Sequence, residues 1–82
     1  MTHKRQEVYD CIDGERDYQD SLNSRRLESG EEILLIQEYA DRARLSWTEN
    51  FTENPNSEYL HMVRKIAGIA VRCLEHHGVP QR

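Results

Sequence analysis

The sequence predicts an all-α protein in which one chain supplies three helices to a helical bundle that is completed by oligomerisation. Apolar residues recur at spacings of three and four, which is typical of one face of a helix. Two polar breaks, "NSRRLESG" and "TENPNSE", divide the chain into three such segments. A chain of 82 residues with 37% hydrophobic residues forms a single domain with only a modest core of its own, which favours self-association.

The first helix is expected at about residues 3–23, with Thr2 as its N-cap. Glu15 and Gln19 fall among the apolar residues of this segment and share one face with them. We therefore expect both polar side chains to point inward. The apolar residues of that face are Val8, Cys11, Ile12, Tyr18 and Leu22.

The second helix is expected at about residues 31–49. Ser29 precedes Glu32 by three positions, which is the spacing of a capping box at a helix N-terminus. Apolar residues occupy more than one face of the segment, and this predicts more than one neighbour. One face carries Ile33, Ile36, Ala40, Ala43 and Trp47, and Leu34, Leu35, Tyr39 and Leu45 lie beside it.

The third helix is expected at about residues 57–77, with Asn56 or Ser57 as its cap and Gly78 just beyond its end. Its apolar residues cover more than half of its circumference, so it should be the most buried helix. Gly68 lies mid-helix, where glycine costs about 1 kcal/mol relative to alanine, and this suggests tight packing. Packing of this helix against its symmetry mate is the expected contact between subunits. Its two apolar faces are Leu60, Val63, Ala67, Ala70, Val71 and Leu74, and Met62, Ile66, Ile69 and Cys73.

The charge of the chain is unevenly distributed. The net charge of −4 argues against general coating of DNA or RNA, which requires a basic surface. Residues 7–20 are acidic and residues 61–82 are basic, so the two segments are expected to meet within the fold or between subunits. No apolar run approaches the length of a membrane span, and "MTHKRQ" lacks a secretory signal. We therefore expect a cytoplasmic protein without a membrane partner.

Polar residues of the third helix share one face: His61, Arg64, Lys65, Gly68, Arg72 and Glu75. This face is either a solvated or salt-bridged surface, or a site for an anion. In the second case Arg64 and Arg72 flank Gly68, where a phosphate can approach the helix closely. The acidic block "ERDYQD" offers a related choice. Its carboxylates can hold Mg²⁺, or Glu15 can pair with a cation of the third helix, namely Arg64, Lys65 or Arg72.

Aromatic and histidine residues add further candidates. Tyr39, Trp47 and Tyr18 can stack on a base or belong to the core. His76 lies in the last turn of the third helix, where the helix dipole favours a cation. Because His76 and His77 point in different directions, no zinc site is expected.

Glu38 and Asp41 of the second helix have the E-x-x-D spacing, and Glu31 precedes them by about two turns. This arrangement resembles the Mg²⁺ site of the all-α nucleoside triphosphate pyrophosphohydrolases of the MazG type. Those enzymes carry a second carboxylate pair on the next helix. Here that helix offers only Glu58 and Glu75, far apart, so the complete set of four carboxylates is absent.

The order of motifs resembles a group of small helical proteins common in bacteriophage genomes, which are distantly similar to the MazG-type fold. The matching blocks are "ERDYQD" (15–20), "GEEILLIQEYADRARLSW" (30–47) and "VRKIAGIAVRCLEHHG" (63–78), and they extend over nearly the whole chain. The chain departs from the group at "SLNS", where an aromatic and tryptophan signature often follows the first block. The resemblance implies a phage protein directed at host defence, and some such proteins trap a signalling nucleotide between subunits.

Three functional hypotheses follow. The first is a non-catalytic, oligomeric protein that sequesters a linear or cyclic nucleotide without a cofactor. The second is a MazG-like hydrolase that uses Glu31, Glu38 and Asp41 with Mg²⁺. The third is a protein-interaction module that docks a host protein on the second helix. For the first, the candidate ligand-binding residues are Glu15, Arg16, Gln19, Asp20, Tyr39, Trp47, Arg64, Lys65, Arg72 and His76.

Overall fold

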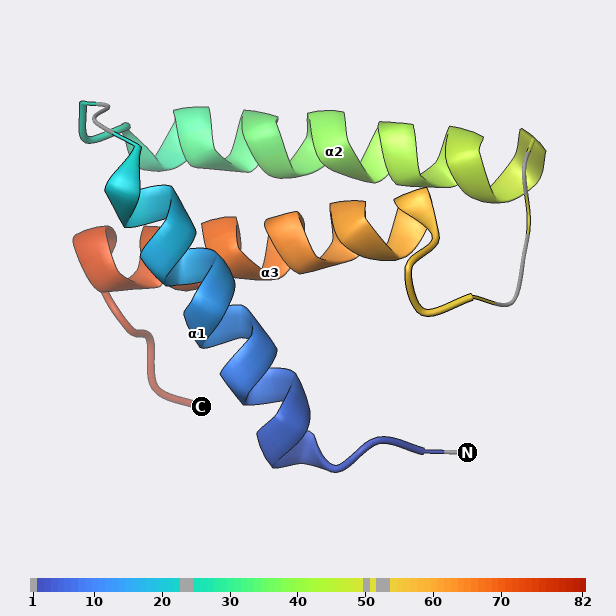
Figure 1. Cartoon of the computed structure of the whole chain (residues 1–82). Helices are drawn as coiled ribbons and strands as arrows, with labels where there is room; N and C mark the ends of the chain where they lie inside the picture. Colours follow the sequence, from blue (N-terminus) through green and yellow to red (C-terminus); the bar gives the residue numbers. More distant parts are fainter. Residues whose placement is uncertain (1, 23–24, 50, 52–53) are drawn as a thin grey trace.

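The computed structural model describes residues 2–22, 25–49, 51 and 54–82. It contains three helices, α1 (Arg5–Ser21), α2 (Ser29–Glu49) and α3 (Glu58–His77) (Figure 1). The all-α fold class is therefore confirmed. Each helix boundary lies within two residues of the position expected from the sequence.

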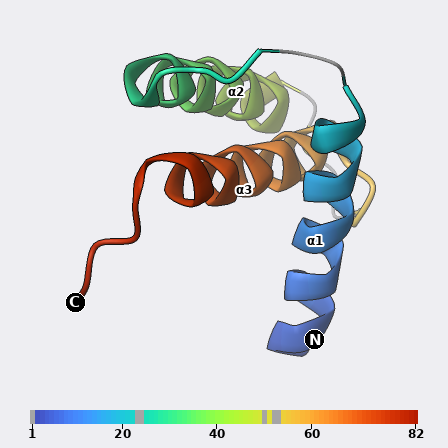
Figure 2. The ribbon, with the colours of Figure 1, turned by 90° about the vertical axis from the view of Figure 1, so that its left-hand side faces the viewer.

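Helix α3 lies at the centre of the molecule. It runs antiparallel to α2, and α1 crosses it obliquely (Figures 1 and 2). Helix α3 packs against both neighbours, whereas α1 and α2 make no close backbone contact with each other in the described part of the chain. Both chain ends lie on the side of the bundle away from α2 (Figure 1). The separation of α1 from α2 leaves one side of α3 open between them.

Two of the expected helix caps are wrong. Helix α1 begins at Arg5, and Lys4 rather than Thr2 occupies the cap position, where its carbonyl accepts the first backbone hydrogen bonds. Ser29 is not an N-cap because it is already helical. Glu32 does not complete a capping box, since its side chain is fully buried against α3.

The ends of α3 follow the sequence more closely. Ser57 occupies the N-cap position, and its carbonyl accepts hydrogen bonds from two backbone amides of the first turn. The amide of Gly78 donates to the carbonyl of Leu74, which closes the last turn. Gly78 has φ of +134°, a conformation that glycine adopts without a steric penalty.

The interior of the single chain is polar. Among the described residues with apolar side chains, only Ile69 is fully buried, whereas Glu15, Arg16, Gln19 and Glu32 are all buried. Within the single chain, α3 buries only part of its apolar surface. Its face with Leu60 and Leu74 points away from α1 and α2 and is exposed. Within the described ranges, no helix combines the length and the apolar character that spanning a membrane requires.

Ion pairs join α3 to each neighbour. Helix α1 is held by Glu15 with Arg64 (2.9 Å) and by Arg16 with Glu75 (2.7 Å). Helix α2 is held by Glu32 with Arg72 (2.7 Å). A buried charge costs several kcal/mol unless it is paired, so these contacts specify how the three helices meet. The acidic segment thus meets the basic one within the fold, which is one of the two arrangements that the sequence allowed; the other was a contact between subunits.

Gly68 permits the close approach of α1 to α3. A Cβ atom at this position would lie 2.7 Å from both Nε2 of Gln19 and Cγ of Glu15. The mid-helix glycine therefore has the packing role that the sequence suggested. The same contact covers Gly68, so a ligand cannot approach the helix backbone there.

We predict opposite effects for two glycine-to-alanine substitutions. Gly14→Ala in α1 meets no atom within 4 Å, so it should stabilise the fold by about 0.5–1 kcal/mol through helix propensity. Gly68→Ala should instead destabilise it by about 1 kcal/mol or more, because the methyl group displaces Gln19 and Glu15. Urea denaturation of both variants measures the difference. Equal stabilisation by the two substitutions would contradict the packing at Gly68.

Candidate functional site

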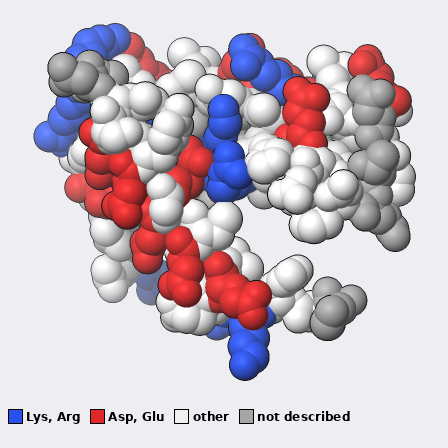
Figure 3. Space-filling view, in the orientation of Figure 1, with Lys and Arg blue, Asp and Glu red and all other residues white. Residues whose placement is uncertain are grey.

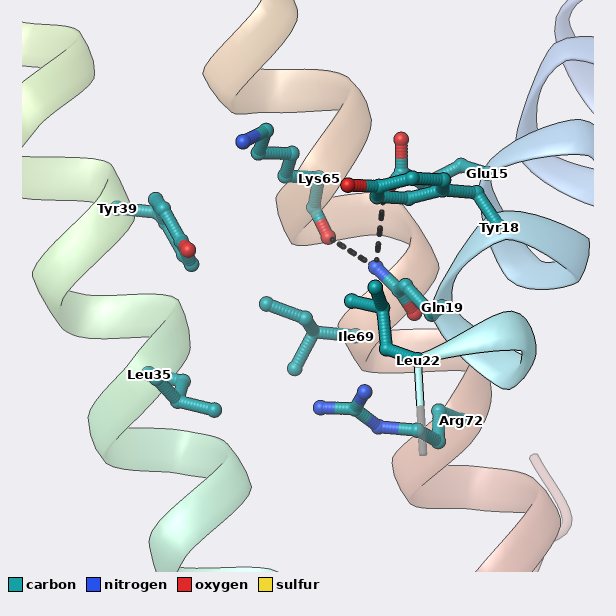
Figure 4. A pocket seen from close by; sticks show the side chains of 9 residues that line it. All are labelled: Glu15, Tyr18, Gln19, Leu22, Leu35, Tyr39, Lys65, Ile69 and Arg72. Carbon is teal, nitrogen blue, oxygen red and sulfur yellow. Dashed lines mark hydrogen bonds between the residues drawn. The ribbon is translucent and has the colours of Figure 1, made fainter. Parts of the chain in front are cut away.

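A cleft of about 290 Å³ opens over α3 between α1 and α2. This volume is at the lower end of the range of small-molecule sites, so the cleft suits a compact ligand rather than a polymer. Helix α3 supplies its floor, and side chains of α1 and α2 stand on opposite sides (Figure 4). The lining residues are Glu15, Tyr18, Gln19, Leu22, Leu35, Tyr39, Lys65, Ile69 and Arg72.

Two tyrosines offer aromatic surface in the cleft. Tyr18 comes from α1 and Tyr39 from α2 (Figure 4). The ring of Tyr39 contacts two cations, with the Arg42 guanidinium carbon at 5.3 Å and Lys65 Nζ at 5.6 Å from its centroid. An aromatic face of this kind can stack on a planar heterocycle.

Lys65 supplies a positive charge that the fold has not neutralised. Its ammonium group forms no ion pair with the described residues, although its backbone carbonyl accepts a hydrogen bond from Gln19 (3.4 Å). The ammonium group contacts the Tyr39 ring, so a cation and an aromatic surface lie side by side. Such a pair can bind a ligand that combines a negative charge with a planar ring.

Arg72 lies in the cleft but is held by Glu32. Its Nε and Nη2 atoms donate to the Glu32 carboxylate at 2.7–3.2 Å, and that carboxylate is fully buried. The Nη1 atom donates no hydrogen bond to any residue that the structure describes. One edge of the guanidinium, with Nε and Nη2, therefore stabilises the fold, and Nη1 can donate to a ligand.

Glu15 and Gln19 point inward, as the sequence predicted, but their polar atoms are largely engaged. Glu15 accepts from Arg64 through Oε1 and from Gln19 through Oε2. The Gln19 amide oxygen accepts from Arg16 (3.2 Å). These residues form one edge of the cleft and fix the position of α1 on α3.

Arg16 and Asp20 belong to the contact between α1 and α3. Arg16 donates through Nε to Glu75 and through Nη2 to Asp20. Burial alone lowers the pKa of the Arg16 guanidinium, but the hydrogen bonds to Glu75 and Asp20 outweigh it and raise the pKa above its ordinary value. Neither residue lines the cleft.

Of the two alternatives for the polar face of α3, the geometry around Gly68 does not match the anion site flanked by Arg64 and Arg72. Arg64 pairs with Glu15 and also contacts Nδ1 of His61 at 2.6 Å. Gly68 is covered by α1, and Arg64 does not line the cleft beside Arg72. The salt-bridged interpretation of this face is therefore correct for Arg64.

Trp47 and His76 lie outside the cleft. Trp47 is exposed near the turn between α2 and α3. Its ring meets that of Phe51 edge to face, with 5.8 Å between the ring centroids, and Phe51 stacks on Tyr59. The backbone carbonyl of His76 accepts a hydrogen bond from Arg26 at the other end of the hairpin. The cleft thus unites Glu15, Gln19, Tyr39, Lys65 and Arg72, half of the candidate ligand-binding residues.

The candidate set lacked four residues that line the cleft: Tyr18, Leu22, Leu35 and Ile69. The sequence does identify Tyr18 as a stacking candidate, and its position one residue before Gln19 is the signal that places it near the cleft. The other three are aliphatic residues on apolar stripes. Periodicity assigns such residues to a core, and nothing in the sequence separates a cleft wall from a core.

Two of the three carboxylates of the hydrolase hypothesis, Glu31 and Glu38, are engaged in ion pairs. Glu31 binds Arg25 (2.6 Å) and Glu38 binds Arg42 (3.0 Å). The hydrogen bond from Arg25, followed by one from the Glu28 amide, lowers the pKa of Glu31 to about 2. In the described part of the chain, no three histidine, cysteine or acidic side chains are placed to hold one metal ion.

The surface reflects the uneven charge of the sequence. Acidic side chains gather along α1, and basic atoms lie between α1 and α2 in the same view (Figure 3). On α2, Ile33 and Leu34 are exposed, as the protein-docking hypothesis requires.

Comparison of the chain with models of protein families, with curated proteins and with solved structures finds no match.

We predict that the Glu32–Arg72 pair controls stability beneath the cleft. Glu32→Gln should destabilise the fold by about 3–5 kcal/mol, because Arg72 loses its buried counter-charge. The matched control Glu38→Gln breaks an exposed pair with Arg42 and should cost about 0.5 kcal/mol or less. Urea denaturation measures both values. Similar stabilities of the two variants would show that the buried pair is not a structural requirement.

Proposed function

We propose that this chain is a non-catalytic protein that binds a small linear or cyclic nucleotide in the cleft and sequesters it. One observation carries the proposal. Lys65 and Tyr39 present an unneutralised cation and an aromatic face side by side in a cleft of about 290 Å³. A nucleotide joins a planar base to an anionic phosphate and so matches both groups.

The base is assigned to the aromatic side of the cleft. Tyr39 on α2 and Tyr18 on α1 stand on opposite sides, with Ile69 of α3 between them and Leu35 on the same side as Tyr39 (Figure 4). Stacking on an aromatic ring is tolerant of base identity, because every base has a π face. This supports recognition of a class of nucleotides rather than of one base.

The phosphate is assigned to Lys65 and to the Nη1 atom of Arg72. Lys65 is a mobile point charge, whereas Arg72 is held in place by Glu32. Glu15 and Gln19 are engaged with Arg64 and Arg16, so their role is to fix α1 against α3. Asp20 likewise pairs with Arg16 outside the cleft, so none of these three candidates is assigned a contact with the nucleotide.

The resemblance to small phage proteins supports a signalling nucleotide of host defence as the ligand. We propose that the protein acts in the host cytoplasm as a homo-oligomer, since the single chain has a polar interior and exposes much of its apolar surface. Binding without turnover lowers the free concentration of a signal. This is sufficient for an inhibitor that is made in excess of its ligand.

The charge of Lys65 provides the first functional prediction. Lys65→Met should weaken binding of AMP, ATP or a cyclic dinucleotide by about tenfold or more, because a charge-assisted contact is lost. The control Lys4→Met removes a lysine that precedes α1 and lies outside the cleft. Isothermal titration calorimetry of the two variants compares them. Equal affinity for every nucleotide that the natural chain binds would place the ligand elsewhere.

The Tyr39 ring provides the second functional prediction. Tyr39→Leu should reduce affinity about fivefold or more, because stacking on a base contributes about 1–3 kcal/mol. Tyr9→Leu is the matched control, since Tyr9 is exposed on α1 and does not line the cleft. Quenching of tyrosine fluorescence by the nucleotide provides an independent signal. A loss of affinity in Tyr9→Leu but not in Tyr39→Leu would reject the stacking assignment.

A further inference from the structure

The side of α3 opposite the cleft is an unpartnered apolar face. It consists of Leu60, Val63, Ala67, Val71 and Leu74, which recur at spacings of three and four. The four larger residues are 37–50% exposed, and Ala67 is half-buried. Neither α1 nor α2 covers this face, because both pack on the other sides of α3 through ion pairs with Arg64, Arg72 and Glu75.

The residue types of this face are symmetric about Ala67. Valines lie four positions away on each side, at Val63 and Val71. Leucines lie seven positions away on each side, at Leu60 and Leu74. A contact between two identical chains across a two-fold axis requires that residue i meets residue j and residue j meets residue i. On a face with this symmetry, each leucine lies opposite a leucine of the other chain and each valine lies opposite a valine.

We propose that a second copy of the chain covers this face, with the two α3 helices antiparallel and the two-fold axis at Ala67. Leu60 then packs on Leu74 of the partner subunit, and Val63 approaches the partner's Val71. The small side chain of Ala67 at the axis permits the helix axes to approach to about 8–10 Å. The sequence predicted that α3 packs on its symmetry mate. The exposure of this face identifies which side is available, and the symmetry of its residues is the basis of the direction and centre that we propose.

The polar interior of the single chain favours a second copy over an unrelated partner. Only Ile69 is a fully buried apolar residue among those described, so the chain obtains little hydrophobic stabilisation by itself. Pairing of two α3 faces creates an apolar core between the subunits. Because every copy of the chain carries this face, no other protein is needed to form that core. The face lies on the far side of α3 from Lys65, so dimer formation and nucleotide binding can fail separately.

Cysteine exchange tests the direction of the contact. In a background of Cys11→Ser and Cys73→Ser, we prepare Leu60→Cys and Leu74→Cys as separate proteins and treat them with a short bismaleimide cross-linker. In the antiparallel dimer, the two copies of residue 60 are about 21 Å apart along the helices, so neither protein should cross-link with itself. An equilibrated mixture of the two should give a cross-linked dimer. Self-cross-linking of either protein as efficiently as the mixture, or no cross-linking of the mixture, overturns the proposal.

A charge at the axis provides the second arm of the test. Ala67→Glu places two carboxylates against each other and should convert the dimer into the 9.7 kDa monomer, measured by size-exclusion chromatography with light scattering. Ala40→Glu makes the same change at an exposed position of α2 and should leave the dimer intact. A dimer that persists in Ala67→Glu overturns the proposal. If the natural chain forms the dimer but binds no nucleotide, only the proposed function is rejected.

Discussion

The pairing of buried charges is the constraint on which the rest of this structure depends. Glu32 has no solvent access and pairs with Arg72, and Glu15 and Arg16 are buried at the contact between α1 and α3. A charge in such a place must find an opposite charge within reach, because the alternative costs several kcal/mol. The ion pairs therefore decide which side of α3 faces its neighbours. The apolar side is left outward as a consequence.

The same pairing determines which cations remain for a ligand. Arg64 and Arg16 lie in the contact between α1 and α3, where Arg64 donates to Glu15 and Arg16 donates to Glu75. Arg72 is held along one edge by Glu32. Lys65 lies one residue beyond Arg64, a rotation of about 100° around the helix, and reaches the open space between α1 and α2. Helix α3 thus presents a cleft with charged and aromatic groups on one side and an apolar face on the other. We assign the first to the ligand and the second to the partner subunit.

The helices could be predicted from the sequence because periodicity, polar breaks and the Gly78 terminus are local signals. The inward direction of Glu15 and Gln19 could also be predicted, since both lie on an apolar stripe. The orientation of α3 could not, because a helix that is apolar over more than half of its circumference fits a neighbour on several sides. The choice of Lys65 over Arg64 depends on ion pairs with residues about 50 positions away in the chain. No pattern within one helix contains that information.

Native mass spectrometry of the whole chain, incubated with a panel of linear and cyclic nucleotides and Mg²⁺, tests the two sides of α3 together. It measures the number of subunits, the retained ligand and any change in ligand mass in the same spectrum. We expect a dimer or a higher oligomer that retains an unmodified nucleotide. A monomer that binds no member of the panel would contradict both assignments. Release of pyrophosphate from a triphosphate would show instead that the cleft supports catalysis.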